Sequence, residues 1–199
     1  KANGLPLVFD NTYNEPSYYT FYTGQECFAV NDIWYKKTQY NYLPGLEQKF
    51  QNKAVAYVSD GPVDKTSREV IIPKGKKYYL TFIDQFTSFA NVNVRVLNPV
   101  SSLKNSEEST FEVSVDASRH DIERLKLTKA FLILTFTDNQ TQVRTYYTYP
   151  LAGTVNGRPL KLTFKTPIAR GQYRYQFSVV AKQHVGAGFN SNIYNCKVN

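Results

Sequence analysis

The sequence contains few of the residues that carry common reaction chemistry. Its 199 residues include two histidines, two cysteines, one tryptophan and no methionine. The strings HExxH, GxSxG, GxGxxG and GxxxxGK[ST] do not occur, so the usual signals of metal, nucleophile and phosphate sites are missing. His120 and His184 lie in separate segments; His120 is predicted to be a surface residue and His184 a loop residue at the end of a strand. We therefore expect no catalytic residue, no metal and no cofactor, and a protein that is not an enzyme.

Long apolar runs are also missing. No run approaches the roughly 20 residues needed to cross a bilayer, and we expect no membrane span and no remaining signal peptide. Because the chain begins with Lys1 and has no Met, we expect a processed N-terminus or an excised fragment. The formal net charge is +8, yet the basic residues are spread along the chain without a nucleic-acid-binding motif. We expect no nucleic-acid partner.

The two cysteines, Cys27 and Cys196, lie near opposite ends of the sequence. This separation excludes a CxxC metal or redox motif. Two interpretations stay open. One is a possible disulfide that joins the first part of the chain to the last strand, which suits an oxidising compartment, and the other is a pair of buried free thiols.

What the chain has in abundance is tyrosine and phenylalanine, 16 and 13 residues, and both favour strands. The stretch 170–182 (RGQYRYQFSVVAK) alternates apolar and polar residues, as a strand with one buried face does. Similar patterns predict further strands at 5–9, 18–23, 54–59, 69–72, 77–84, 90–97, 111–115, 129–138, 142–149, 160–164 and 192–198, and a strand, turn and strand within 25–35.

Helical patterns are few. Residues 118–126 have a helical composition with Ser118 as a cap, although a crossing loop is the alternative, and LPGLEQKF (43–50) favours one helical turn. Residues 98–109 (NPVSSLKNSEES) have the composition of a linker or exposed turn. We predict an all-β protein made of two tandem β-sandwich modules, an aromatic-rich module over 1–98 and a second module over 99–199.

The second half resembles the immunoglobulin-like and fibronectin-III-like modules of secreted and cell-surface proteins. The residues that carry this resemblance are PLKLTF (159–164) and GQYRYQFSVVAKQHVGAG (171–188). The resemblance implies an immunoglobulin-like β-sandwich in which Tyr173 is a corner tyrosine whose hydroxyl holds the preceding loop. The chain departs from the antibody pattern, since Cys196 has no partner within this half and the only tryptophan is Trp34.

The strongest functional signal is a belt of aromatic residues in the first half. Exposed tyrosine and tryptophan rings stack on sugars and anchor protein interfaces. Asn31, Asp32, Gln39 and Asn41 are interleaved with the belt and would supply hydrogen bonds. The alternative is that half of these rings belong to the core. The predicted ligand-binding residues are Tyr18, Tyr19, Tyr22, Trp34, Tyr35, Tyr40 and Tyr42, with Tyr13 at the start of the belt.

Carboxylates offer weaker signals. Asp60 and Asp64 flank a Gly-Pro turn at a spacing compatible with a loop calcium site, but the turn geometry alone also explains them. A pair of carboxylates that meet only in space would make the protein a carbohydrate-active hydrolase or its accessory domain.

We therefore expect a secreted, periplasmic or cell-surface protein with a non-enzymatic role in adhesion, binding or assembly. Its partner would be a glycan or another protein on the cell surface or envelope. Two alternatives remain: a structural subunit of an envelope or surface assembly, and the hydrolase or accessory domain.

Overall fold

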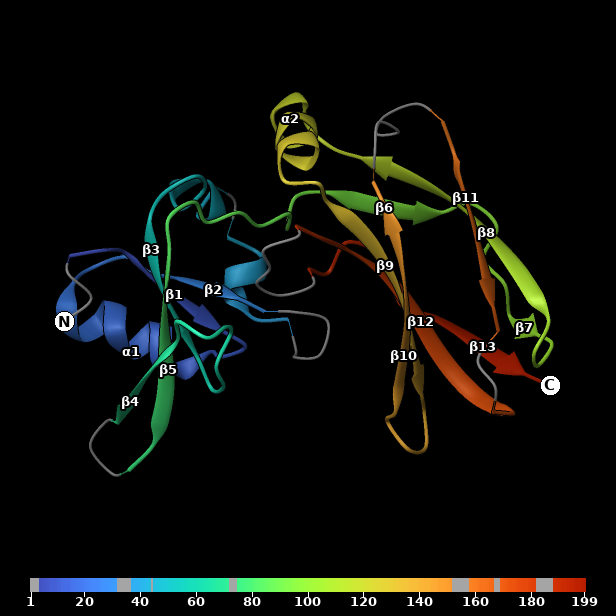
Figure 1. Ribbon diagram of the computed structural model, residues 1–199, viewed down its shortest axis with the longest axis horizontal. Coiled ribbons are helices and arrows are strands. Elements are labelled where there is room, and N and C mark those ends of the chain that lie inside the picture. The colour runs from blue at the N-terminus through green and yellow to red at the C-terminus, as the bar shows by residue number, and fades with distance from the viewer. Residues whose placement is uncertain are drawn as a thin grey trace. The chain divides into compact units, whose positions relative to one another are not determined.

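A computed structural model describes residues 4–31, 37–43, 45–71, 75–151, 158–166, 169–181 and 188–199. Strands dominate this part of the chain, which confirms the predicted β character. The chain divides into two compact units, with residues up to Ser88 in the first and the chain from Phe89 onward mainly in the second. Each unit is described by itself below, with the element labels of Figure 1.

The first unit contains five strands, one α-helix and two short 3-10 helices among its described residues. Their bounds are β1 (Leu7–Asp10), α1 (Asn14–Thr23), β2 (Phe28–Val30), η1 (Gln39–Asn41), η2 (Glu47–Lys49), β3 (Val55–Ser59), β4 (Arg68–Ile71) and β5 (Lys77–Ile83). The helical turn predicted within 43–50 is confirmed by η2.

The strands of the first unit form one mixed sheet in the order β2-β1-β3-β5-β4. β1 pairs in parallel with β2 and β3, whereas β5 is antiparallel to β3 and β4. The core lies on one face of this sheet and includes Val8, Phe28, Val55, Tyr57 and Phe86. A sandwich predicts two sheets, and the described residues of this unit form one, so the sandwich prediction is not confirmed here.

The segment predicted as a strand at 18–23 is instead part of helix α1, and that prediction was wrong. The alternation of tyrosine and threonine suggested a strand, but the ends of the segment carry helix signals. Pro16 lies in the first turn, where a missing N–H costs no hydrogen bond, and Glu15 is acidic in the same turn. Gly24 ends the helix in the left-handed conformation, with φ 68°, and its N–H donates to the Thr20 carbonyl.

The second unit contains eight strands and one α-helix among its described residues. Their bounds are β6 (Asn93–Val96), β7 (Ser102–Leu103), β8 (Glu108–Asp116), α2 (Arg119–Leu127), β9 (Phe131–Asp138), β10 (Arg144–Pro150), β11 (Leu160–Lys165), β12 (Gly171–Val180) and β13 (Tyr194–Val198). The strand predicted at 170–182 is confirmed as β12, which lies at the centre of its sheet.

Two sheets form the second unit, one ordered β10-β9-β12-β13-β7 and the other β11-β8-β6. Aromatic rings join them: the ring of Phe111 on β8 lies 4.8 Å from that of Tyr175 on β12, and Phe136 on β9 lies 5.4 Å from Phe164 on β11. All four rings belong to one buried apolar cluster. The two sheets therefore share a core.

The predicted linker at 98–109 belongs to the second unit. It contains β7 and the start of β8, and β7 pairs with β13. The side chain of Asn98 donates to the Thr110 carbonyl and accepts from the Glu112 N–H, so this segment is bonded to its neighbours. Because β6 pairs with β8, the predicted module boundary between residues 98 and 99 falls inside this unit.

Three local predictions concern the second unit. The helical alternative for 118–126 is confirmed by α2, whose cap Ser118 accepts from the Asp121 N–H at 3.1 Å. Tyr173 donates its hydroxyl to the Ala169 carbonyl at 3.1 Å, which is the contact expected of a corner tyrosine. The Asn156-Gly157 pair predicts a tight hairpin turn, and these two residues lie outside the described part of the chain.

Both cysteines are free and buried, Cys27 in the first unit and Cys196 in the second. Of the two interpretations, the structure therefore has the pair of buried thiols, and it contains no disulfide between them. Burial raises the pKa of both thiols, that of Cys196 to about 11, so both are protonated at neutral pH.

Candidate functional site

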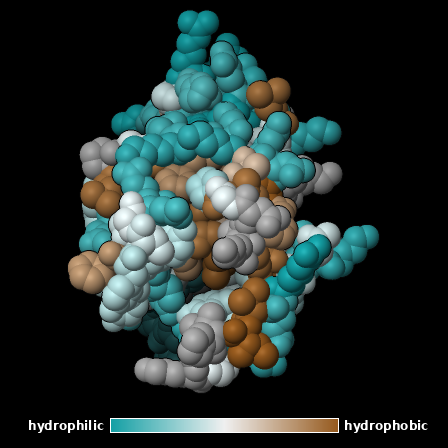
Figure 2. Space-filling model, turned by 90° about the vertical axis from the view of Figure 1, so that its left-hand side faces the viewer, coloured by the Kyte–Doolittle hydropathy of each residue, from teal (hydrophilic) through white to brown (hydrophobic). Residues whose placement is uncertain are grey.

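The first unit contains an open groove of about 470 Å³ between helix α1 and one face of the sheet. Figure 2 shows one face of the protein, on which brown apolar side chains lie among paler and hydrophilic ones. The lining of the groove is mainly aromatic and aliphatic. The lining residues are Leu7, Phe9, Glu15, Tyr18, Tyr19, Val58, Val70, Tyr78, Tyr79 and Leu80. We call this feature the aromatic groove.

Strand register builds the floor of the aromatic groove. Phe9 on β1 is opposite Val58 on β3, and Val58 is opposite Leu80 on β5. Successive side chains of a strand point to opposite faces, so the residues between these, such as Tyr57, face the core instead. The floor is thus the sheet face that the core of the unit does not use.

Helix α1 forms one wall. Tyr19 points toward the sheet, where its ring lies 6.1 Å from that of Phe9 and its hydroxyl donates to Gln25 Oε1 at 2.6 Å. Tyr18 lies at the rim with 61% of its surface exposed. One tyrosine therefore holds the helix on the sheet, while the ring of its neighbour is exposed.

A cluster of polar groups closes one end of the groove. The Glu15 carboxylate accepts hydrogen bonds from Lys76 Nζ at 2.6 Å, from the Tyr78 hydroxyl at 2.7 Å and from Thr12. Lys76 also lies over the Tyr78 ring, 4.6 Å from its centre. Partial burial acts to raise the pKa of Glu15, but these hydrogen bonds, that from Lys76 foremost, outweigh it and lower the pKa to about 2. Glu15 is therefore ionised at neutral pH and holds α1 to β5.

The structure separates the tyrosines of the predicted belt. Tyr18 and Tyr19 line the aromatic groove, whereas Tyr22 and Tyr42 are 79% and 69% exposed and do not line it. Tyr40 is 7% exposed and its hydroxyl lies 3.4 Å from Ser17 Oγ, so the prediction that its ring belongs to an exposed face was wrong.

The rest of the belt is partly described. Trp34 and Tyr35 lie outside the described residues, as do Asp32 and His184. Tyr13 is 40% exposed and precedes α1.

The described polar residues interleaved with the belt form hydrogen bonds to other side chains of the first unit. Asn31 is 2% exposed, and its amide donates to Thr38 Oγ1 at 2.6 Å and to Asn41 Oδ1 at 3.1 Å. Gln39 contacts Ser17 Oγ at 3.5 Å. These groups were expected to serve a ligand, and instead they stabilise the loop around η1.

Sequence reasoning missed most of the groove floor, including Phe9, Val58, Val70, Tyr78 and Leu80. A signal was present in KYYLTFID (77–84), where one alternate set contains Tyr78, Leu80 and Phe82 and the other contains Tyr79 and Ile83. Such a strand needs a cover on each face. The partial cover that α1 provides is what leaves a groove.

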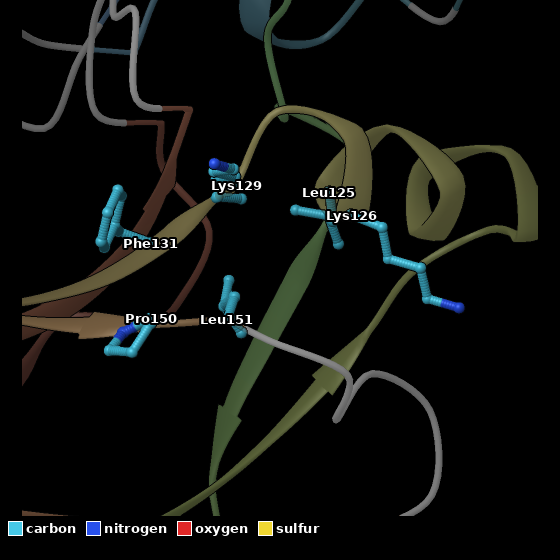
Figure 3. Close-up of a pocket in the computed structure, with 7 residues that line it drawn as sticks. Leu125, Lys126, Lys129, Phe131, Pro150 and Leu151 are labelled. Carbon is cyan, nitrogen blue, oxygen red and sulfur yellow. The ribbon is translucent and has the colours of Figure 1, made fainter.

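A second cleft, of about 310 Å³, lies in the second unit at the end of α2 (Figure 3). Leu125, Phe131, Pro150 and Leu151 give it an apolar lining, with Lys129 among them. The side chain of Lys126 points its amine away from the other labelled side chains. This cleft is smaller than the aromatic groove and contains one aromatic ring among its described lining residues.

The remaining candidate residues are not among those that line the groove. Asp64 Oδ1 accepts from the N–H and hydroxyl of Thr66, both at 2.7 Å, so its carboxylate orders the turn. His120 is exposed on α2. Within the described part of the chain, no three His, Cys, Asp or Glu side chains gather as metal ligands would. Neither α1, α2 nor any other helix described has the length and apolar character to cross a membrane.

No protein family profile matches the chain, and no curated protein is significantly similar to it.

Proposed function

We propose that this protein is a non-enzymatic binding protein of the cell surface, envelope or secreted space, and that the aromatic groove recognises apolar side chains of a partner protein. The observation that carries the proposal is an apolar sheet face left half covered by α1, with tyrosine rings at its rim. Open apolar surface bounded by aromatic residues is typical of interaction sites, because burying it on binding is favourable.

The lining favours a protein partner over a glycan. Sugar recognition combines a stacking ring with several hydrogen-bonding side chains, and the one charged side chain among the described lining residues, Glu15, is already bonded to Lys76 and Tyr78. What the groove still offers is apolar contact with aliphatic and aromatic side chains.

A glycan remains the second candidate, and exposed rings outside the groove favour it. Tyr22 is 79% exposed, Phe21 is 81% exposed, and their rings form an edge-to-face pair 5.2 Å apart. Such a pair on a helix surface offers a flat face to a sugar ring.

In this proposal the second unit is an immunoglobulin-like spacer. Supporting observations are its two sheets with a shared aromatic core and the Tyr173 hydroxyl bonded to the Ala169 carbonyl. Spacers of this kind hold a binding unit away from a surface, which fits a protein of the envelope or the extracellular space.

The experiment compares Tyr18→Ala with Tyr22→Ala, two identical changes four residues apart on α1. Wild type and both variants are each screened against a phage-displayed library of random octapeptides and against a glycan array. We expect enriched peptides that no longer bind the Tyr18→Ala variant and still bind the Tyr22→Ala variant, because of these two tyrosines only Tyr18 lines the groove.

Two results would contradict the proposal. Glycan binding that both variants lose would instead support a stacking face along α1. A wild-type protein that enriches no peptide at all would remove the groove as a protein-binding site. Circular dichroism of each variant checks that α1 is intact, as expected for substitutions of exposed side chains.

A further inference from the structure

The aromatic groove runs to an open edge of its sheet. β4 is the last strand in the order, and its outer side pairs with no strand in the part of the chain that the structure describes (Figure 1). All four of its residues are exposed. An open edge presents main-chain N–H and C=O groups in the pattern that another strand would pair with.

Strand register places two residues of β4 on the groove side of the sheet. Arg68 is opposite Leu80 and Val70 is opposite Tyr78, and both partners on β5 line the groove. Val70 lines it too. Glu69 and Ile71 alternate with them and point to the other face. The groove therefore reaches the edge at Val70, with a cation two positions away.

We propose that an extended segment of a partner protein adds to the outer edge of β4 as a further strand. This inference rests on the proposed function and specifies how the partner binds. A strand added at the usual spacing of about 4.8 Å would place every second side chain on the groove side. One of these side chains is apolar and covers Val70 and the groove, and the next is acidic and faces Arg68.

Charge supports an acidic residue in the partner. The two neighbouring cations already have partners, since Lys76 binds Glu15 at 2.6 Å and Lys77 binds Glu69 at 3.0 Å. Arg68 is exposed and forms no ion pair with any residue that the structure describes. With a chain charge of +8, an acidic segment is also attracted at a distance.

The edge itself has little that would repel a partner. Natural edge strands are commonly protected by proline, bulges or several charges. β4 (REVI) has no proline, and its Glu69 is paired with Lys77. A second copy of this chain is the other conceivable occupant, but two β4 strands would bring two Arg68 side chains to one short edge.

The test uses octapeptides enriched from the library on the wild-type protein. Each is synthesised in three forms: unmodified, N-methylated at odd positions and N-methylated at even positions. A strand pairs with β4 through alternate residues only, so one methylated form should lose binding and the other should keep it. Removing the hydrogen bonds between the peptide and β4 should raise the dissociation constant on the order of tenfold or more.

Charge reversal tests the predicted contact between Arg68 and an acidic residue of the partner. Arg68→Glu should weaken binding of the unmodified peptides about three- to tenfold, and changing the acidic residue of the peptide to Lys should restore it. Arg170→Glu is the matched control, because Arg170 is exposed in the second unit and should leave binding unchanged.

Each contrary outcome has a distinct meaning. Peptides that need Tyr18 but bind equally in all three backbone forms would refute strand addition and leave the groove as a binding site. Enriched peptides without an acidic residue, unaffected by Arg68→Glu, would refute the charge contact. A dimer in sedimentation that Arg68→Glu alters would make a second copy the occupant. No enriched peptide at all would refute both this inference and the proposed function.

Discussion

Asn190 provides the sharpest test of how the second unit is held together. The residue is 2% exposed, and its amide donates to the carbonyls of Phe89 and Val92 at 2.6 and 2.7 Å. Its Oδ1 accepts from the Val179 N–H at 2.7 Å. One side chain thus joins the first residues of the unit to its central strand β12.

We expect Asn190→Ala to destabilise the second unit by about 3 to 5 kcal/mol. The change leaves the Val92 carbonyl and the Val179 N–H without the partner that Asn190 provides, and each buried polar group of this kind costs about 1–3 kcal/mol. The Phe89 carbonyl loses one hydrogen bond and keeps the one from the Val92 N–H. Phe89, Val92 and Val179 are themselves at most 4% exposed, so water has little access to the groups left behind. The loss would be a large part of a typical unfolding free energy of about 5–15 kcal/mol.

The assay is urea unfolding followed by far-ultraviolet circular dichroism and tyrosine fluorescence, from which the free energy of unfolding is extrapolated. Asn192→Ala is the matched control, because Asn192 is exposed and should change stability by less than about 0.5 kcal/mol. A loss below about 1 kcal/mol for Asn190→Ala would refute the reasoning, since the Val92 carbonyl and the Val179 N–H would then have found other partners.

Two further predictions concern single side chains. Glu15 has its folded-state pKa lowered to about 2, so its contribution is fully present above pH 4.5 and is lost as the pH falls through about 2. Acid titration should lower the free energy of unfolding by about 1 kcal/mol, which is less than the full pKa shift would give because the Lys76 amine is half exposed. The Glu15→Gln variant should lose this pH dependence. A variant that titrates like the wild type would contradict the assignment. Tyr173→Phe deletes only the hydroxyl that bonds to the Ala169 carbonyl, and should lower the free energy of urea unfolding by about 1 kcal/mol. Equal stability of Tyr173→Phe and wild type would show that this hydroxyl does not hold the loop.

Local sequence patterns were sufficient to predict a strand or helix wherever the residues of that segment favoured one kind of secondary structure. The alternation at 170–182 predicted β12, and the helical composition of 118–126 with Ser118 as a cap predicted α2. The same approach failed at α1, where alternating tyrosine and threonine fitted a strand as well as a helix. There the signals at Pro16 and Gly24, at the two ends, determined the outcome.

The candidate site was predictable only in part. Tyr18 and Tyr19 were identified because they lie in a stretch of sequence that is rich in aromatic residues, and both line the groove. Tyr40 belonged to the same pattern and is buried, because it packs near Ser17 once α1 forms. A count of aromatic residues along the chain does not say which rings face a core.

By itself the sequence determined that the chain is rich in strands, where most of those strands lie, and that the first half is unusually aromatic. Only the tertiary structure decided which strands pair and which face each presents. Phe9, Val58 and Leu80 meet because β1 and β3 pair in parallel and β3 pairs with β5. Such pairings join residues far apart in the chain, and their stability depends on the burial of the whole sheet, which no local stretch of sequence records.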